Sequence, residues 1–409
     1  MQDVVKKRRY HISYLIILFI IVTGSPGYSK GPELTIPFQV INNFIIIDLK
    51  VNGSPGMKFI YDSGSEHSLF FERELAQLFK VNIGRSIKIF GSDLSRPIDA
   101  TIGKMVNFET DENQMVQADI IILDENIFQL DKYSGLPISG IIGNSFFKHK
   151  VLEIDYDRLK LKVFTPNNIN PKKSGYHEVQ TRWLKGKPYI KPKFYFTNTG
   201  IKEGEILFDS GASVGLLLYK NFLDTTMIPN KLIAGTIGMG LGGPLEGYLG
   251  RIQRMEIDWA VEENVITNFQ QIDTFTLKND QSGKQGILGN SIISKFNVLL
   301  DFNNQKLYLK RNRFGKKSAR IDRSGLFIIA SGVNLNEYTV KDIIRNSAAM
   351  EAGILPGDKI LRINGFSSKN YNLGTLNAKF SKPGKKKVRL KILRNGMKYN
   401  ISFLLRDII

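Results

Sequence analysis

The strongest indication of catalytic chemistry in this sequence is a pair of Asp-Ser-Gly triplets. They stand at Asp62-Ser63-Gly64 and Asp209-Ser210-Gly211, and each follows an apolar run. Two carboxylates that share a site hold one proton between them, because the charge of the first opposes ionisation of the second. The ionised carboxylate can take a proton from water while the protonated one polarises a peptide carbonyl. If the fold brings Asp62 and Asp209 together, the pair can therefore hydrolyse a peptide bond.

The triplets belong to a longer internal repeat. Gly140-Ile141-Ile142-Gly143-Asn144-Ser145 follows the first triplet, and Gly286-Ile287-Leu288-Gly289-Asn290-Ser291 follows the second. The aspartates are 209 − 62 = 147 positions apart, and the glycine motifs are 286 − 140 = 146 apart. Landmarks that recur in the same order and spacing indicate two copies of one structural unit. Two such units can bring two carboxylates to a shared seam.

Short apolar runs separated by turn residues predict that both copies are rich in strands. The strands expected in the first copy span residues 44–49, 57–61, 120–123, 151–154 and 159–164. One helix is expected at residues 72–79. Asparagines, prolines and paired lysines at residues 166–175 predict a linker, after which the second copy runs from about residue 176 to residue 310.

The paired triplets and the later apolar-apolar-Gly steps resemble those of aspartic peptidases, specifically the retropepsin-like, pepsin-related bacterial proteins with both lobes in one chain. The resemblance covers about residues 35–310. It implies a mainly β, two-lobed fold in which Asp62 and Asp209 are catalytic. Residues that would support the catalytic loops are Ser63, Gly64, Ser65, Ser210, Gly211 and Ala212. Residues that would pack beside these loops are Ile142, Gly143, Leu288 and Gly289.

A glycine-rich segment lies where the substrate-covering flap of this family would fall in the second copy. Residues 235–250 hold seven glycines, of which Gly240, Gly242 and Gly243 are the candidate flap residues. This composition suits a tight hairpin. The corresponding residues 91–103 of the first copy hold fewer glycines. The sequence therefore leaves open which of the two hairpins covers the cleft.

Other catalytic chemistries have weaker support. The chain has no cysteine, and its histidines, His11, His67, His149 and His177, have no metal-ligand spacing. No Gly-x-Ser-x-Gly motif of serine hydrolases occurs. Residues 238–243 lack the Lys-Ser/Thr pair that completes a phosphate-binding loop. We therefore expect no metal site and no organic cofactor.

The C-terminal residues resemble a PDZ domain. The most specific match is the run from 352 to 358, Ala-Gly-Ile-Leu-Pro-Gly-Asp, together with Ile363-Asn364-Gly365. The resemblance implies helices at 348–352 and 373–380 and a strand at 359–363. Ser324-Gly325-Leu326-Phe327 resembles the loop whose amides hold a peptide C-terminal carboxylate, which implies that Gly325, Leu326 and Phe327 line the peptide groove. PDZ domains bind peptides by adding a strand to a sheet edge, and a packing module without a ligand is the alternative.

The N-terminus predicts export by a bacterial signal peptide. A basic run at 6–9 precedes an apolar stretch at 14–22, and Gly27-Tyr28-Ser29 offers small residues to a signal peptidase. The apolar stretch is about half the length that spans a bilayer, and an uncleaved anchor is the alternative. We expect the protein in the periplasm, in the cell envelope or outside the cell.

Positive charge is concentrated near the C-terminus. From residue 311 onward, 21 Lys/Arg stand against 6 Asp/Glu, so 21 − 6 = +15 of the total +19 lies there. We interpret most of this charge as a solvated surface, with weak association with the envelope surface as the alternative. No nucleic-acid partner is expected, because the interleaved aromatic and basic residues of single-strand binders are absent.

These features predict a signal peptide at 1–29, aspartic peptidase lobes at 30–165 and 166–314, and a PDZ domain at 315–409. The predicted function is an exported, monomeric aspartic endopeptidase acting on peptides or proteins, with a PDZ domain that binds C-termini. One alternative is a catalytically inactive peptide-binding or scaffold protein that acts through the PDZ groove. Retention of both acids argues against it, because a binding protein does not need them. Another alternative is a structural envelope protein held by its basic tail.

Overall fold

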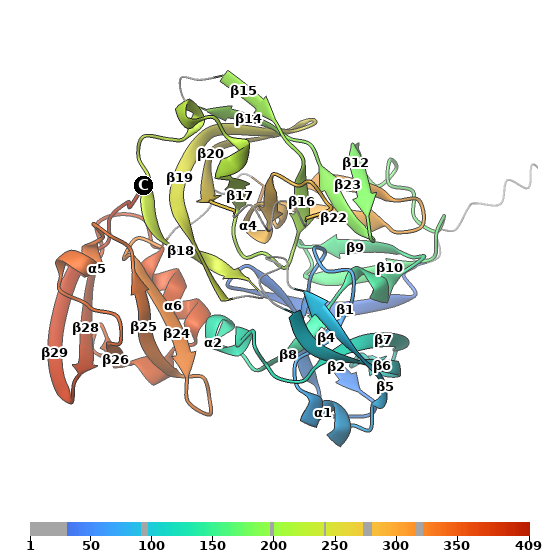
Figure 1. Cartoon of the computed structure of the whole chain (residues 1–409), viewed down its shortest axis with the longest axis horizontal. Coiled ribbons are helices and arrows are strands. Elements are labelled where there is room, and N and C mark those ends of the chain that lie inside the picture. Colours follow the sequence, from blue (N-terminus) through green and yellow to red (C-terminus); the bar gives the residue numbers. More distant parts are fainter. Residues whose placement is uncertain (1–30, 91–96, 197–199, 241–242, 273–279, 316–321) are drawn as a thin grey trace, which may run out of the picture.

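The computed structural model describes residues 31–90, 97–196, 200–240, 243–272, 280–315 and 322–409. The predicted signal peptide and the candidate flap residue Gly242 lie outside these ranges. Within them the protein is mainly β and forms three sheets (Figure 1). No helix in the described ranges has the length and apolar character needed to cross a membrane.

The N-terminal part of the chain, which we call the first repeat, contains ten strands and three short helices in its described residues. The strands are β1 (Leu34–Ile41), β2 (Phe44–Val51), β3 (Met57–Tyr61), β4 (Leu69–Phe70), β5 (Asn82–Phe90), β6 (Pro97–Glu109), β7 (Met115–Leu123), β8 (Ile138–Ile142), β9 (Val151–Asp155) and β10 (Lys160–Phe164). The helices are α1 (Arg73–Leu78), α2 (Leu130–Ser134) and the 3-10 helix η1 (Asn144–Phe147). The strands and the helix expected in this part are confirmed to within a residue or two, except that β7 begins earlier than expected. Leu159 precedes β10 in a left-handed turn, with φ 55°.

The second repeat follows with strands from β11 to β23. The strands are β11 (His177–Val179), β12 (Thr181–Leu184), β13 (Lys187–Ile190), β14 (Lys193–Phe196), β15 (Gly200–Glu203), β16 (Ile206–Asp209), β17 (Leu216–Tyr219), β18 (Ile233–Gly240), β19 (Gly243–Ile257), β20 (Ala260–Gln270), β21 (Gly286–Gly289), β22 (Phe296–Asp301) and β23 (Lys306–Arg311). Its described helices are η2 (Lys220–Phe222), η3 (Thr225–Met227) and α4 (Asn290–Ile293).

The strand pairings of the first repeat recur in the second. In the first repeat, β3 runs parallel to β8, β8 pairs antiparallel with β4, and β4 runs parallel to β7. The second repeat has the same relations between β16 and β21, β21 and β17, and β17 and β20. Beyond these strands, β7-β6-β5 corresponds to β20-β19-β18. Strand β14 pairs with β19 as the end of β2 pairs with β6. The internal repeat predicted from the sequence is therefore a repeat of topology.

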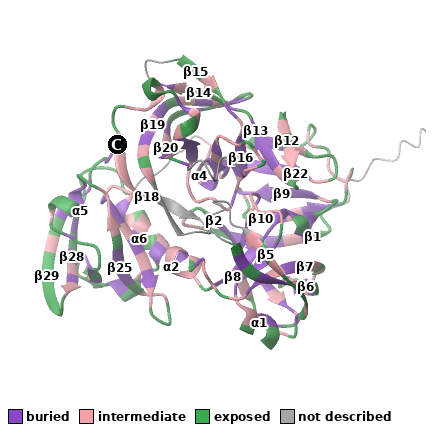
Figure 2. Ribbon diagram, viewed as in Figure 1, coloured by how far each residue is buried: buried purple, intermediate pink, exposed green. Residues whose placement is uncertain are grey.

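One sheet joins the two repeats. Strand β9 pairs antiparallel with β22, so that Ile154 faces Val298 and Leu152 faces Leu300. All four of these side chains are buried in a core that both repeats share. Figure 2 shows the buried residues of β9 and β16 near the centre of the molecule. Because burying apolar area is the main stabilising term in folding, this shared core fixes the position of one repeat against the other.

The C-terminal domain has a sheet and a core of its own. Its elements are β24 (Leu326–Ser331), β25 (Glu337–Ile343), α5 (Ala348–Glu351), β26 (Lys359–Ile363), β27 (Phe366–Ser367), η4 (Ser368–Asn370), α6 (Leu373–Phe380), β28 (Lys387–Arg394) and β29 (Met397–Leu404). The main path of the sheet is β24-β25-β26-β28-β29, which leaves β24 at an edge. Asn372 and Thr375 form a reciprocal capping box that starts α6. Figure 1 shows this domain beside α2 and β18.

Candidate active site

Asp62 and Asp209 occupy equivalent places at the carboxyl ends of two buried strands. Asp62 follows β3, and its N–H donates a 3.0 Å hydrogen bond to the Ile142 carbonyl on β8. Asp209 ends β16 and pairs with Gly289 on β21. The four residues predicted to pack beside these loops do lie next to them: Ile142, Gly143, Leu288 and Gly289.

Ser63 and Ser210 join the two aspartate loops through a symmetrical set of hydrogen bonds. The Ser63 hydroxyl donates to the Phe208 carbonyl (3.0 Å) and accepts from the Ser210 N–H (2.9 Å). The Ser210 hydroxyl donates to the Tyr61 carbonyl (3.2 Å) and accepts from the Ser63 N–H (3.0 Å). Both serines are fully buried, so each bond satisfies a group that water does not reach. These bonds fix the separation of the two aspartates.

The two carboxyl groups lie beside each other, and each also packs against the glycine of the opposite loop. The Gly64 N–H donates to Asp62 Oδ1 at 2.7 Å. The Gly211 and Ala212 N–H groups donate to Asp209 Oδ1 at 2.8 and 3.0 Å. Two carboxylates held this close repel each other, so the geometry favours a pair that carries one proton.

The protein environment also favours a proton on the pair. Desolvation by the surrounding protein raises the pKa of Asp62, although hydrogen bonds and the charge of Lys187 act in the opposite direction. Desolvation, followed by the negative charge of Asp62, raises the pKa of Asp209 well above its ordinary value. The carboxyl groups titrate as a pair because each senses the charge of the other. The pair therefore holds a proton at higher pH than an isolated aspartate does.

The glycines of both triplets are required by the close approach of the loops. A Cβ on Gly64 would lie 2.4 Å from Asp209 Cγ, and a Cβ on Gly211 would lie 2.2 Å from Asp62 Cγ. No real side chain tolerates such contacts with heavy atoms. Each glycine is thus packed against the carboxyl group of the opposite loop, and a side chain at either position would separate the aspartates.

Asn144 and Asn290 belong to the site, although the sequence analysis gave them no role. Their N–H groups donate to the carbonyls of Ser65 (3.0 Å) and Ala212 (2.7 Å), one residue after each triplet. The Asn144 side chain also donates to the Ser63 carbonyl at 2.8 Å. The signal was present in the sequence, because a polar residue recurs at the same place after each otherwise apolar motif.

The same asparagines tie each repeat to a hairpin of the other. Asn144 Nδ2 donates to the Gly186 carbonyl in the β12–β13 turn at 2.9 Å. Asn290 Nδ2 donates to the Asn43 carbonyl in the β1–β2 turn at 2.7 Å. Asn43 in turn donates its side-chain amide to the Ser213 carbonyl at 2.8 Å. Both hairpins are thereby held beside the aspartate pair.

Lys187 follows the anchored Gly186 turn and is a second residue that sequence reasoning missed. Its ammonium group interacts electrostatically with Asp62, Glu66 and Asp209, and is repelled by Lys284. Desolvation lowers the pKa of this lysine. The charge beside the aspartates was not predictable, because Lys187 has no counterpart in either triplet motif.

Both predicted flap hairpins exist. In the second repeat, β18 and β19 pair as far as Gly240 opposite Gly243. In the first repeat, β5 and β6 pair as far as Phe90 opposite Pro97. The two hairpins occupy equivalent positions in the repeated topology.

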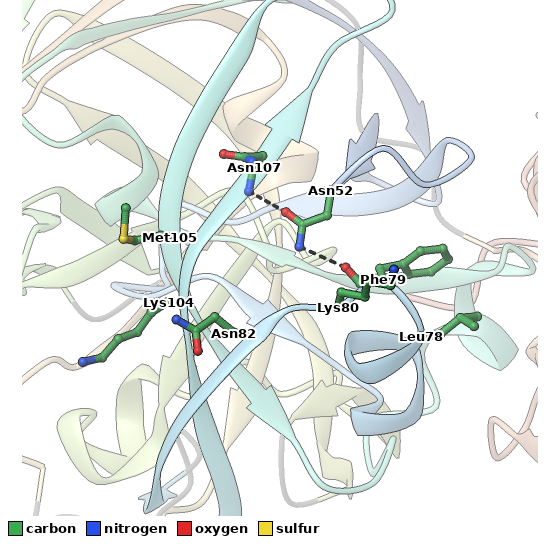
Figure 3. A pocket seen from close by; sticks show the side chains of 8 residues that line it. All are labelled: Asn52, Leu78, Phe79, Lys80, Asn82, Lys104, Met105 and Asn107. Carbon is green, nitrogen blue, oxygen red and sulfur yellow. Dashed lines mark hydrogen bonds between the residues drawn. The ribbon is translucent and has the colours of Figure 1, made fainter.

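A pocket of about 530 Å³ lies elsewhere in the first repeat (Figure 3). Its walls are Asn52, Leu78, Phe79, Lys80, Asn82, Lys104, Met105 and Asn107. Asn52 holds two walls together, because it donates to the Phe79 carbonyl and accepts from the Asn107 N–H, both at 3.0 Å. Neither Asp62 nor Asp209 lines this pocket, so it is separate from the aspartate site.

The C-terminal domain places the predicted groove residues at the start of its edge strand. Leu326 and Phe327 begin β24, directly after Gly325, and α6 packs beside this strand. The predicted strand 359–363 and helix 373–380 coincide with β26 and α6. Residues 339–394 match the PDZ domain family. The prediction of a PDZ domain is therefore confirmed, and a PDZ domain suggests a peptide or protein partner. No curated protein matches the chain.

Proposed function

We propose that this protein is an aspartic endopeptidase that hydrolyses peptide bonds through Asp62 and Asp209. The observation that carries the proposal is the close pair of buried carboxyl groups, held in place by reciprocal serine hydrogen bonds. A shared proton supplies one acid and one base within a single site, which is what amide hydrolysis by water requires. A binding surface has no use for two carboxyl groups forced together against their mutual repulsion.

The reaction follows from the proton on the pair. The ionised carboxylate removes a proton from a water molecule as the water oxygen attacks the peptide carbonyl carbon. The protonated carboxyl group donates its proton to the carbonyl oxygen, which gives a neutral gem-diol. The carboxyl group that received the water proton passes it to the amide nitrogen. The other carboxylate takes a proton from a gem-diol hydroxyl as the C–N bond breaks, and an amine and a carboxylic acid leave. The pair returns to its singly protonated state, so that no cofactor is consumed.

The proposal includes a pepsin/retropepsin-like fold in which the two repeats are the two lobes. The supporting observations are the strand pairings that recur in both repeats, the sheet that joins β9 to β22, and the position of each aspartate at the end of an equivalent strand. We also propose that the N-terminal segment directs export of the protein to the periplasm or envelope, and that the protein acts as a monomer. The PDZ domain would bring peptide or protein partners to the enzyme.

Cleavage of peptides by the intact protein tests this function. Residues 30–409 would be incubated with a diverse peptide mixture between pH 4 and pH 7, and the products identified by mass spectrometry. We expect internal cleavage that requires no added metal. A folded protein that cleaves nothing over this range would remove the peptidase proposal, and would favour a peptide-binding scaffold that acts through its PDZ domain.

A Lys187→Met variant is expected to move the pH profile of cleavage to higher pH. The ammonium group of Lys187 favours ionisation of the neighbouring carboxyl groups and lowers the pKa of Asp62. Loss of this charge therefore raises both pKa values of the pair, which set the acidic and the basic side of the pH profile. A plot of kcat/KM against pH measures the shift. Lys185→Met, in the same turn, is the matched control and should leave the profile in place. An unchanged profile for both variants would show that Lys187 does not tune the pair.

A further inference from the structure

The amides of the PDZ loop are already bound to groups of the same chain. Asp322 Oδ1 accepts from the N–H groups of Ser324 (2.9 Å) and Gly325 (2.6 Å), and from the Ser324 hydroxyl (2.7 Å). The Leu326 N–H donates to Ser324 Oγ at 3.1 Å. Each N–H has one proton to donate. These three amides are therefore not free to receive the carboxylate of a peptide.

The open side of the PDZ groove is covered by the first repeat. Helix α2 lies against β24, the strand whose free edge would accept a ligand (Figure 1). The Tyr133 ring stacks on the Phe327 ring, with centroids 6.0 Å apart. A Cβ on Gly135 would lie 2.7 Å from Leu373 Cβ, at the start of α6. The segment from Leu130 to Gly135 therefore contacts both walls of the groove.

Polar contacts support the same docking. Asn42 Oδ1 accepts a 3.2 Å hydrogen bond from Asn377 Nδ2 on α6. The side-chain amide of Asn42 donates to the Ser134 carbonyl at 3.2 Å, which links the β1–β2 turn to α2. On another side of the PDZ domain, β18 of the candidate flap hairpin contacts β25, and a Cβ on Gly235 would lie 3.8 Å from Ile344. The PDZ domain thus touches both repeats.

We propose that the resident ligand of the PDZ groove is the chain itself, with Asp322 on the loop amides and residues 130–135 along β24 and α6. A free peptide C-terminus then binds only in molecules where these two internal ligands have been displaced. The PDZ domain contacts the first repeat through its groove and the candidate flap hairpin through β25, and a C-terminal peptide competes with the internal ligands of the groove. This inference is independent of peptidase activity.

The chemistry of Asp322 fits the role of an internal carboxylate ligand. Burial raises the pKa of Asp322 to about 6, while its hydrogen bonds oppose the rise. At pH 7.5 the group is therefore ionised, and a charged acceptor binds amide donors more strongly than a neutral one does. A competing peptide carboxylate has to replace a charged acceptor that is covalently attached to the loop.

The test compares peptide binding by the closed and opened grooves in the 30–409 protein. The probe is a set of labelled decapeptides ending in Val, Leu, Ile, Phe or Ala, with free or amidated C-termini, measured by fluorescence anisotropy at pH 7.5. The opened variants are Tyr133→Ala and Asp322→Ala, alone and combined. The matched control is Tyr399→Ala, an exposed tyrosine on β29 of the same domain.

We expect the combined variant to bind free-carboxylate peptides at least about tenfold more tightly than the parent, because apparent affinity falls with the fraction of competent molecules. The control should bind as the parent does, and amidated peptides should bind none of the proteins. Equal affinity of parent and opened variants, including no binding by either, would overturn the proposal.

A second measurement needs no substitution and covers the case in which a variant fails to fold. Hydrogen–deuterium exchange of the parent protein should show slow exchange of the α2 and β24 amides, and saturating free-carboxylate peptide should accelerate exchange in α2. Fast exchange in α2 without peptide would contradict docking in solution. If the peptide binds measurably but the exchange rate of the α2 amides does not change, the peptide and α2 do not compete for the groove.

Discussion

Asp62→Asn and Asp209→Asn are each expected to lower kcat/KM for peptide cleavage by about 10³-fold or more. Either change removes the acid or the base of the pair, and positioned general acids and bases contribute about 10²- to 10⁴-fold each. The asparagine side chain retains the shape of the aspartate and can still accept from the loop amides (Gly64, Gly211 and Ala212). Initial rates on the best peptide from the cleavage mixture measure the loss. The control is Glu66→Gln, which removes a nearby carboxyl group outside the pair and should retain activity.

The stability of these variants separates lost chemistry from lost fold. The folded-state pKa of Asp209 lies above its ordinary value, so the contribution of this group to stability is present at low pH and is lost as pH rises toward the folded-state pKa. The asparagine side chain of the variant does not titrate, so the variant has no such loss. The free energy of unfolding of Asp209→Asn relative to the parent should therefore increase from about pH 4 to pH 8. A variant that is inactive and less stable at every pH would point to misfolding instead.

Ser63→Ala and Ser210→Ala are expected to lower the free energy of unfolding by about 2 kcal/mol each, and by roughly 4 kcal/mol together. Each change leaves one N–H and one carbonyl group of the opposite loop buried without a partner. For Ser63 these are the Ser210 N–H and the Phe208 carbonyl. Urea unfolding followed by tryptophan fluorescence reports on the second repeat, because both tryptophans, Trp183 and Trp259, lie there.

Ser65→Ala provides the matched control for the serine pair. Ser65 is two positions from Ser63, but its hydroxyl donates to the His67 carbonyl at an exposed site. Its loss should change the free energy of unfolding by less than about 0.5 kcal/mol. If Ser63→Ala were as mild as Ser65→Ala, the reciprocal hydrogen bonds would not be what holds the two loops together.

Much of the fold was predictable because its signals are local or periodic. Apolar runs predicted β3, β9 and most of β10, and the recurrence of Asp-Ser-Gly and Gly-Asn-Ser motifs predicted a duplicated unit. The PDZ match rested on a contiguous run of residues, and it predicted β26 and α6 with the bounds that the structure has. Signals of this kind need no knowledge of which segments meet in space.

The partners of Lys187, Asn144 and Asn290 could not be predicted in the same way. Each of these side chains acts across the two repeats, on groups between about 40 and 250 positions away in the sequence. Docking of α2 against the PDZ groove joins residues that are likewise far apart in the sequence. No motif marks α2 as a ligand, because stacking of Tyr133 on Phe327 depends on shape and position.

By itself, the sequence determined the inventory of this protein: two aspartates in repeated loops, two matching glycine motifs and a PDZ domain. Those features consist of residue types at fixed spacing, and the local conformational preferences of these residues favour the observed strands and turns. Only the tertiary structure decided that the two aspartates meet, that glycine is required beside each, and that α2 lies against the PDZ groove. Such facts depend on distances between atoms from separate segments, which are fixed only when the shared core forms.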